Sequence, residues 1–222
     1  MEQDKPTLDR RDFLSFTAMS AMFGMGTAAL PAATAIAADG PATDFTRWLD
    51  SIPGKHRALF DAREPNSGFP MVWTWVYLFT APPAYGVQES DVGVAMVLRH
   101  NAIPLALNDA AWAKYKLGEF FSIQDPTTKA PAVRNPYYAS MAEPFFPDMA
   151  LQKLIDRGVK VVACDMAIHF YSMLMAKKMG AKHDDVKADW MQSVLPGVAH
   201  APSGVVACQG AVARGCSYIF AG

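Results

Sequence analysis

The chain has 222 residues, of which 51% are apolar and 18% are charged, and its formal net charge is −1. This length and composition favour one globular domain with a substantial core. A nearly neutral chain without a basic patch argues against nucleic acid as a partner. The sequence also has no G-x-G-x-x-G, Walker or G-x-S-x-G motif, so nucleotide binding and serine hydrolysis have no motif support.

Residues 1–37 have the three parts of an export signal. Arg10 and Arg11 precede Phe13 and Leu14, a small-residue apolar stretch follows, and the segment closes on an A-x-A sequence that ends at Ala37. The paired arginines make this segment resemble a twin-arginine signal. Signals of this class export proteins that are already folded. We therefore predict cleavage after Ala37 and export to the periplasm through the Tat translocase, with a retained N-terminal anchor as the alternative.

The remaining chain is predicted as a polar N-terminal arm over residues 38–53, with one helical turn near 45–49, and one α/β domain over residues 54–222. Short apolar runs alternate with helical patterns, which predicts a mainly parallel five-stranded sheet in a three-layer sandwich with helices on both faces. The predicted strands are 55–61, 91–99, 159–164, 197–201 and 216–220. The predicted helices are 71–79, 110–117, 148–157, 166–179 and 204–214, and Pro82 and Pro83 are expected to end the first of them.

A proline-rich stretch at about 124–147 interrupts this alternation and predicts an excursion from the domain. It carries five prolines, and nothing in its pattern indicates a regular helix or strand. We expect it to be a flap or a segment used in assembly.

The final third carries a family resemblance. A cysteine, Cys164, closes a predicted strand before a helix, and residues 194–220 read VLPGVAHAPSGVVACQGAVARGCSYIF. This pattern resembles the DsrE/DsrF-like superfamily. The resemblance implies a compact α/β domain that forms trimers or hexamers. It also implies a cysteine that carries sulfur as a persulfide, although many members have no known activity.

Cys164 is the main candidate for chemistry. A helix N-terminus stabilises a thiolate, the form that attacks or carries sulfur, whereas the neighbouring Asp165 disfavours it. Arg99 and His100 close the second predicted strand and could stabilise that thiolate or bind an anionic sulfur species. The alternatives are an inert core cysteine and a polar strand end that faces solvent.

Further polar residues are expected at the same edge of the sheet, because the carboxyl ends of parallel strands meet there. Glu64 and Asn66 follow the first predicted strand, and Ser203 follows the fourth. Turn formation and helix capping explain these residues equally well. Cys208 and Cys216 either form a disulfide in an oxidising compartment or are core residues.

The leading hypothesis is a periplasmic sulfur-handling protein with Cys164 as carrier or nucleophile. Its partner would be a small sulfur compound or a redox or sulfur-transfer protein. No cofactor is predicted beyond a cysteine persulfide. The alternatives are a non-enzymatic binding or assembly module, in which the proline-rich excursion makes the contacts, and a metal-binding protein. No pair of histidines has the close spacing of a common metal motif, so no metal ligands are assigned.

Overall fold

The fold is taken from a computed structural model, which describes residues 44–142 and 144–222. The predicted export signal and its cleavage point after Ala37 lie outside these residues. None of the helices in the described ranges is both long and apolar enough to cross a bilayer.

The centre of the domain is a sheet of five strands, all parallel, in the order β4-β3-β2-β1-β5. The chain therefore adds β2, β3 and β4 on one side of β1 and then crosses to place β5 on the other side. This confirms the predicted α/β class and the five strands. The strands are β1 (His56–Ala62), β2 (Val92–Leu98), β3 (Lys160–Cys164), β4 (Val198–Ala201) and β5 (Cys216–Phe220).

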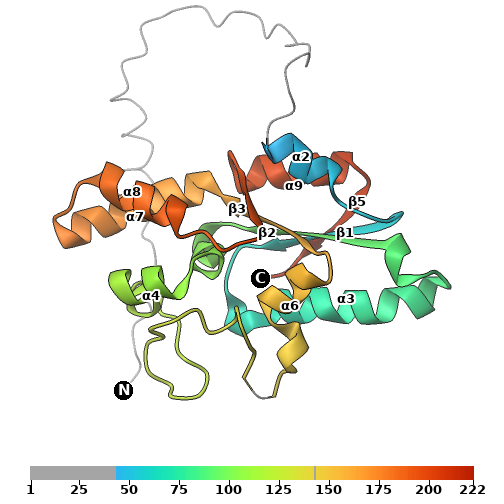
Figure 1. Ribbon diagram of the computed structural model, residues 1–222, viewed down its shortest axis with the longest axis horizontal. Helices are drawn as coiled ribbons and strands as arrows, with labels where there is room; N and C mark the ends of the chain where they lie inside the picture. Colours follow the sequence, from blue (N-terminus) through green and yellow to red (C-terminus); the bar gives the residue numbers. More distant parts are fainter. Residues whose placement is uncertain (1–43, 143) are drawn as a thin grey trace, which may run out of the picture. The chain divides into compact units, whose positions relative to one another are not determined.

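Helices cover both faces of the sheet, as a three-layer sandwich requires (Figure 1). Helices α3 (Phe69–Tyr85) and α6 (Leu151–Asp156) lie on one face, and α2 (Asp44–Asp50) and α9 (Gly204–Ala213) lie on the other. Helices α7 (Asp165–Met179) and α8 (His183–Gln192) pack against each other as a hairpin. The shorter elements are α4 (Asp109–Tyr115), α5 (Leu117–Phe120), η1 (Asn66–Gly68), η2 (Glu89–Asp91), η3 (His100–Ala106) and η4 (Pro147–Met149).

The central strands divide their side chains between two cores with a period of two. On β1, Phe60 packs into the core beneath α3, whereas Leu59 packs into the core beneath α9. On β2, Met96 and Val97 divide in the same way. Every residue of β2 is buried, which explains why its sequence is apolar throughout rather than alternating.

Three predictions about local structure were wrong or incomplete. Helix α3 continues through Pro82 and Pro83 to Tyr85, and the Gly86 amide closes its end by donating a hydrogen bond to the Pro82 carbonyl. Helix α8 lies in a stretch that reads as polar, and only Val186 and Trp190, four residues apart, show its buried side. The predicted arm contains α2, which packs into the core beneath α9.

The proline-rich excursion leaves the sheet after α5 and returns at η4. It is tied to the domain by close backbone packing: a Cβ atom at Gly118 would lie 2.2 Å from the carbonyl oxygen of Ala132. The side chain of Asn135 is buried and donates hydrogen bonds to the carbonyls of Leu105 (2.8 Å) and Leu107 (3.1 Å). Ala132 and Asn135 of the excursion are therefore packed against the domain.

The segment before β1 crosses β2 at Gly93, where only glycine fits. A Cβ atom there would lie 1.9 Å from the Pro53 carbonyl oxygen. We expect Gly93→Ala to lower the free energy of unfolding by about 3 kcal/mol or more, the upper end for overpacking against backbone. Gly158→Ala is the control, since no atom lies within 4 Å there and only its positive φ opposes the substitution. Equal losses in urea unfolding for the two variants would contradict this packing.

Candidate functional site

The carboxyl ends of β1 to β4 form the edge at which polar side chains gather, as expected for a parallel sheet. Glu64 follows β1, while Arg99 and His100 follow β2. The register pairs Leu98 with Ala163, which sets Arg99 level with Cys164 on the neighbouring strand. Cys164 pairs in turn with Ala201, the last residue of β4. We call this group of strand ends the carboxyl edge.

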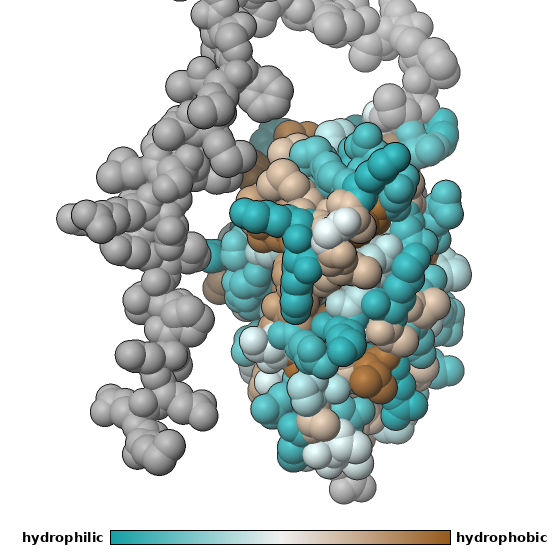
Figure 2. Space-filling view, turned by 90° about the vertical axis from the view of Figure 1, so that its left-hand side faces the viewer, coloured by the Kyte–Doolittle hydropathy of each residue, from teal (hydrophilic) through white to brown (hydrophobic). Residues whose placement is uncertain are grey.

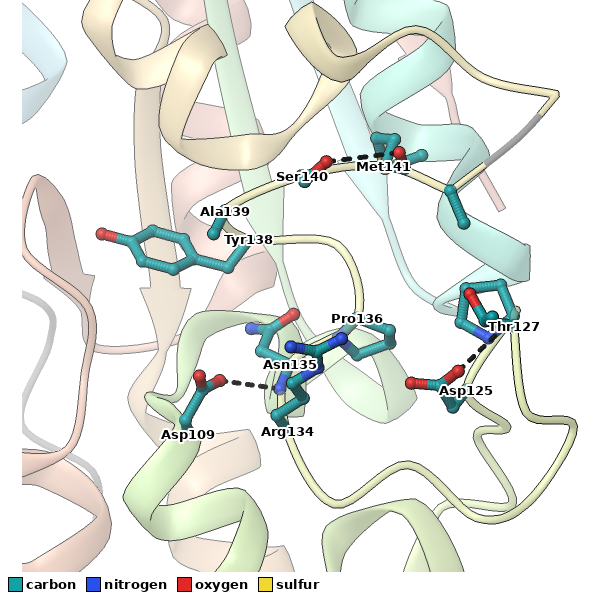
Figure 3. A pocket seen from close by; sticks show the side chains of 12 residues that line it. Asp109, Asp125, Thr127, Arg134, Asn135, Pro136, Tyr138, Ala139, Ser140 and Met141 are labelled. Carbon is teal, nitrogen blue, oxygen red and sulfur yellow. Dashed lines mark hydrogen bonds between the residues drawn. The ribbon is translucent and has the colours of Figure 1, made fainter.

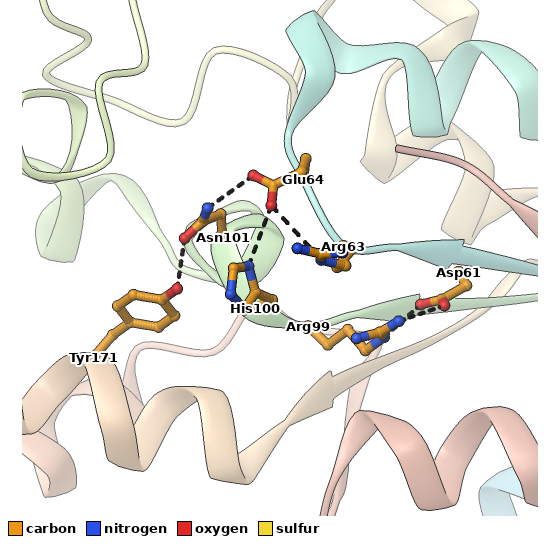
Figure 4. Close-up of polar contacts among 7 residues, drawn as sticks. All are labelled: Asp61, Arg63, Glu64, Arg99, His100, Asn101 and Tyr171. Carbon is orange, nitrogen blue, oxygen red and sulfur yellow. Dashed lines mark hydrogen bonds and ion pairs between the residues drawn. The ribbon is translucent and has the colours of Figure 1, made fainter. Parts of the chain in front are cut away.

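Asp61 holds the centre of this edge, although it stands out in the sequence only as the end of a strand. Its side chain is 1% exposed and accepts two hydrogen bonds of 2.7 Å from the Arg99 guanidinium (Figure 4). The Tyr218 hydroxyl donates a third, at 2.6 Å. Burial alone raises the pKa of Asp61, but these hydrogen bonds outweigh burial and lower it. Two of the five N–H donors of Arg99 are therefore used by Asp61.

A second polar network lies beside the first and uses the other predicted residues of the edge (Figure 4). The Glu64 carboxylate lies 3.2 Å from Nδ1 of His100 and accepts a 2.9 Å hydrogen bond from Asn101. The Tyr171 hydroxyl donates to Asn101 at 2.5 Å, which links α7 to η3. Burial and then the charge of Glu64 raise the pKa of Tyr171 to about 12, so this phenol stays protonated at neutral pH.

Two other predicted residues have structural roles. Ser203 caps α9, where its hydroxyl accepts a 3.2 Å hydrogen bond from the Val206 amide. Asn66 is exposed in the turn between β1 and α3 and has a φ of 39°, a left-handed conformation that asparagine tolerates. Neither residue needs a ligand to explain its conformation.

Cys164 is both the last residue of β3 and the N-cap of α7. Its Sγ accepts a hydrogen bond from the Ala167 amide at 3.3 Å, and the residue is 6% exposed. The neighbouring residue, Asp165, is paired with His200: its carboxylate lies 2.7 Å from Nδ1 of that histidine. That hydrogen bond raises the pKa of His200. Sequence reasoning missed this pair because Asp165 and His200 lie 35 residues apart, on α7 and β4.

The other two cysteines are also free thiols in this structure. Burial, followed by the charge of Asp61, raises the pKa of Cys208 to about 12. Burial also raises the pKa of Cys216. Both are consequently poor nucleophiles at neutral pH. Cys208 lies beside Asp61, Arg99 and Tyr218, which we call the Asp61 cluster.

Two pockets of about 250 and 370 Å³ lie on the proline-rich excursion, and Cys164 lines neither of them. The larger one reaches the turn after β1 through Pro65 and Ser67. Within residues 44–142 and 144–222, no three His, Cys, Asp or Glu side chains gather closely enough to hold a metal ion.

Comparison with protein-family models gave no match. Comparison with curated proteins likewise gave none. The site is therefore interpreted from its own geometry.

The Asp61 cluster predicts a large loss of stability for a conservative substitution of its carboxylate. Asp61→Asn removes the charge that pairs with a partly buried Arg99, and we expect it to lower the free energy of unfolding by about 3–5 kcal/mol. Asp50→Asn removes the partner of Arg214 in an exposed ion pair and should change stability by less than about 1 kcal/mol. Chemical denaturation at neutral pH measures both.

The same carboxylate predicts a dependence on pH. The pKa of Asp61 is lower in the folded protein, so its contribution is complete above the unfolded value of about 4 and is lost as pH falls through the folded value. We expect Asp61→Asn to flatten the acid limb of the stability curve. An equally steep acid limb in the variant would contradict this account of Asp61.

Proposed function

We propose that this protein is a periplasmic, DsrE-like sulfur-handling protein in which Cys164 carries sulfur as a persulfide. The observation that carries the proposal is the 3.3 Å hydrogen bond from the Ala167 amide to the Cys164 sulfur at the N-terminus of the fifteen-residue helix α7. Amide donors and the helix dipole at this position stabilise an anionic sulfur, in a thiolate or in a persulfide.

The proposed reaction exchanges one sulfur–sulfur bond for another. After its proton has passed to solvent, the Cys164 thiolate attacks a terminal sulfur of an inorganic polysulfide. A new bond forms between the two sulfurs, the adjacent bond in the polysulfide breaks, and the shortened polysulfide leaves with the electron pair. In the second half of the cycle, an acceptor thiolate attacks the outer sulfur and releases the Cys164 thiolate.

The surroundings of Cys164 limit what can react there. Cys164 is 6% exposed and packs in the core beneath α3, so the proposal requires a reagent of polysulfide size, or a partner thiol presented on a narrow segment, rather than a broad protein surface. The pairing of Asp165 with His200 reduces the repulsion that an incoming anion would meet. A small sulfur compound therefore fits the site better than a large substrate.

Sulfur uptake from polysulfide tests this proposal. We expect the folded protein without residues 1–37 to gain sulfur on the peptide that contains Cys164. We expect Cys164→Ser to slow total uptake by about tenfold or more. Cys208→Ser and Cys216→Ser are the matched controls and should take up sulfur as the wild type does, because burial raises the pKa of both thiols. Peptide mapping by mass spectrometry after alkylation locates the added sulfur.

Equal uptake by Cys164→Ser, or sulfur found only on Cys208 or Cys216, would contradict the carrier role and favour a second function. In that second function the chain is a non-enzymatic binding or assembly module. The observation in its favour is the outer side of α9 and the neighbouring edge strand β5, which expose large apolar side chains: Val205 (69%), Val206 (46%), Val212 (46%), Tyr218 (51%) and Phe220 (58%).

The distribution of apolar surface supports this second function. The face in Figure 2, which looks from the α7 and α8 side of Figure 1, is mostly hydrophilic with separate apolar spots. Helix α9, by contrast, has the sequence GVVACQGAVA, with Gln209 as its one strongly polar side chain. A helix that is apolar on all sides is normally covered. We propose that copies of this chain associate, as trimers or hexamers by the family resemblance.

We further propose that residues 1–37 direct export of the folded protein through the Tat translocase. Replacing both Arg10 and Arg11 with lysine should block export, because the paired arginines are the feature that this route requires. Cell fractionation followed by immunoblotting should then show an uncleaved precursor in the cytoplasm. Normal periplasmic accumulation of the double variant would contradict a twin-arginine signal.

A further inference from the structure

The smaller pocket of the excursion has opposite charges around one cavity (Figure 3). Asp109, Asp125 and Arg134 line a space of about 250 Å³, and their side chains point into it. Asp109 begins α4, whereas the other two belong to the excursion. Cys164 does not line this pocket, so a ligand bound here would be independent of the proposed sulfur chemistry.

Hydrogen bonds hold the floor of this pocket in place before any ligand arrives. The Asn135 backbone amide donates to Oδ1 of Asp109 at 2.9 Å. The Asn135 side chain donates to the carbonyl of Leu105, within η3, and to that of Leu107, which follows η3. The Asn135 side-chain oxygen also accepts from the Tyr137 amide at 3.2 Å. Arg134 and Asp109 are consequently joined through a buried residue rather than through a loose loop.

The opposite wall is equally well ordered. Oδ1 of Asp125 accepts hydrogen bonds of 2.9 Å from the Thr127 and Thr128 amides, which closes a tight turn. The Lys129 amide donates to the Asp125 carbonyl, and the Asp125 amide donates to the Ala130 carbonyl. The hydrogen bond from the Thr128 amide outweighs burial and lowers the pKa of Asp125. This carboxylate is therefore ionised at neutral pH.

The charged groups retain unused hydrogen-bonding capacity. Across the described ranges, the exposed Arg134 guanidinium has no hydrogen bond and no ion pair, and the exposed Asp109 carboxylate accepts one hydrogen bond, from the Asn135 amide. A guanidinium presents five donors, and each carboxylate oxygen can accept more than one hydrogen bond. The pocket thus offers donors and acceptors that the protein itself does not satisfy.

We propose that this pocket binds a small zwitterion of the α-amino acid class. The ligand carboxylate would lie on Arg134, and its ammonium group would lie against the Asp125 carboxylate on the opposite wall (Figure 3). A simple anion would meet the repulsion of the two carboxylates, and a simple cation would leave the Arg134 guanidinium without a ligand partner. A volume of about 250 Å³ suits a molecule at the small end of the ligands that proteins bind.

Calorimetric titration of the full domain with single amino acids tests this proposal. The panel is glycine, L-alanine, L-serine and L-leucine, with acetate and ethylammonium chloride as the two half-ligands. We expect at least one amino acid to bind and both half-ligands to bind about tenfold or more weakly, because each supplies only one of the two charge-assisted contacts.

Three variants locate the binding. Arg134→Gln and Asp125→Asn should each weaken binding about tenfold or more, and the amide introduced by Asp125→Asn retains an oxygen that can close the turn. Lys177→Gln makes the same change of charge as Arg134→Gln outside the pocket and should bind as the wild type does. Unchanged thermal unfolding of each variant confirms that it is folded.

Other results would overturn the zwitterion site. One is that no amino acid of the panel binds. Another is that acetate or ethylammonium binds as tightly as the amino acids. A third is that Arg134→Gln binds an amino acid as tightly as the wild type does. Since Cys164 does not line this pocket, Cys164→Ser should bind the amino acid normally. The two proposals can therefore fail separately.

Discussion

The arrangement of the carboxyl edge depends on the burial of one carboxylate. Asp61 is 1% exposed and remains folded into the domain because Arg99 on the end of β2 and Tyr218 on β5 supply its hydrogen bonds. An unpaired charge at this depth would be strongly unfavourable, so the three strand ends are held in one relative position. The N-terminus of α9 is held as well, since a Cβ atom at Gly204 would lie 2.6 Å from the Arg99 side chain.

This constraint connects the fold to the proposed chemistry. With Arg99 committed to Asp61 and His100 to Glu64, the sulfur of Cys164 depends on the N-terminus of α7 for stabilisation. Burial and then the charge of Asp61 raise the pKa of Cys208, which separates a thiol in a structural role from the one proposed to react. The excursion contributes differently, because one of its pockets is lined by the charged side chains of Asp109, Asp125 and Arg134.

The sequence predicted the sheet well because apolar runs bounded by turns are a local signal. Each of the five strands lies within two residues of its predicted range. Strand order and side-chain pairing could not be predicted in the same way. Asp61 is separated from Tyr218 by 157 residues, and Asp165 from His200 by 35, so neither pair leaves a local pattern. Helix α8 was missed because only Val186 and Trp190 mark its buried side.

Amide hydrogen exchange of the wild type and Asp61→Asn tests the central constraint most directly. The Arg99 amide donates to the Ala62 carbonyl, the Arg63 amide to Gly222, and the Ala221 amide to Asp61, so all three report on the carboxyl edge. We expect these amides to exchange faster in the variant while those of α8 keep their protection. Unchanged exchange at the edge, or the same acceleration in α8, would show that the buried carboxylate does not organise this site.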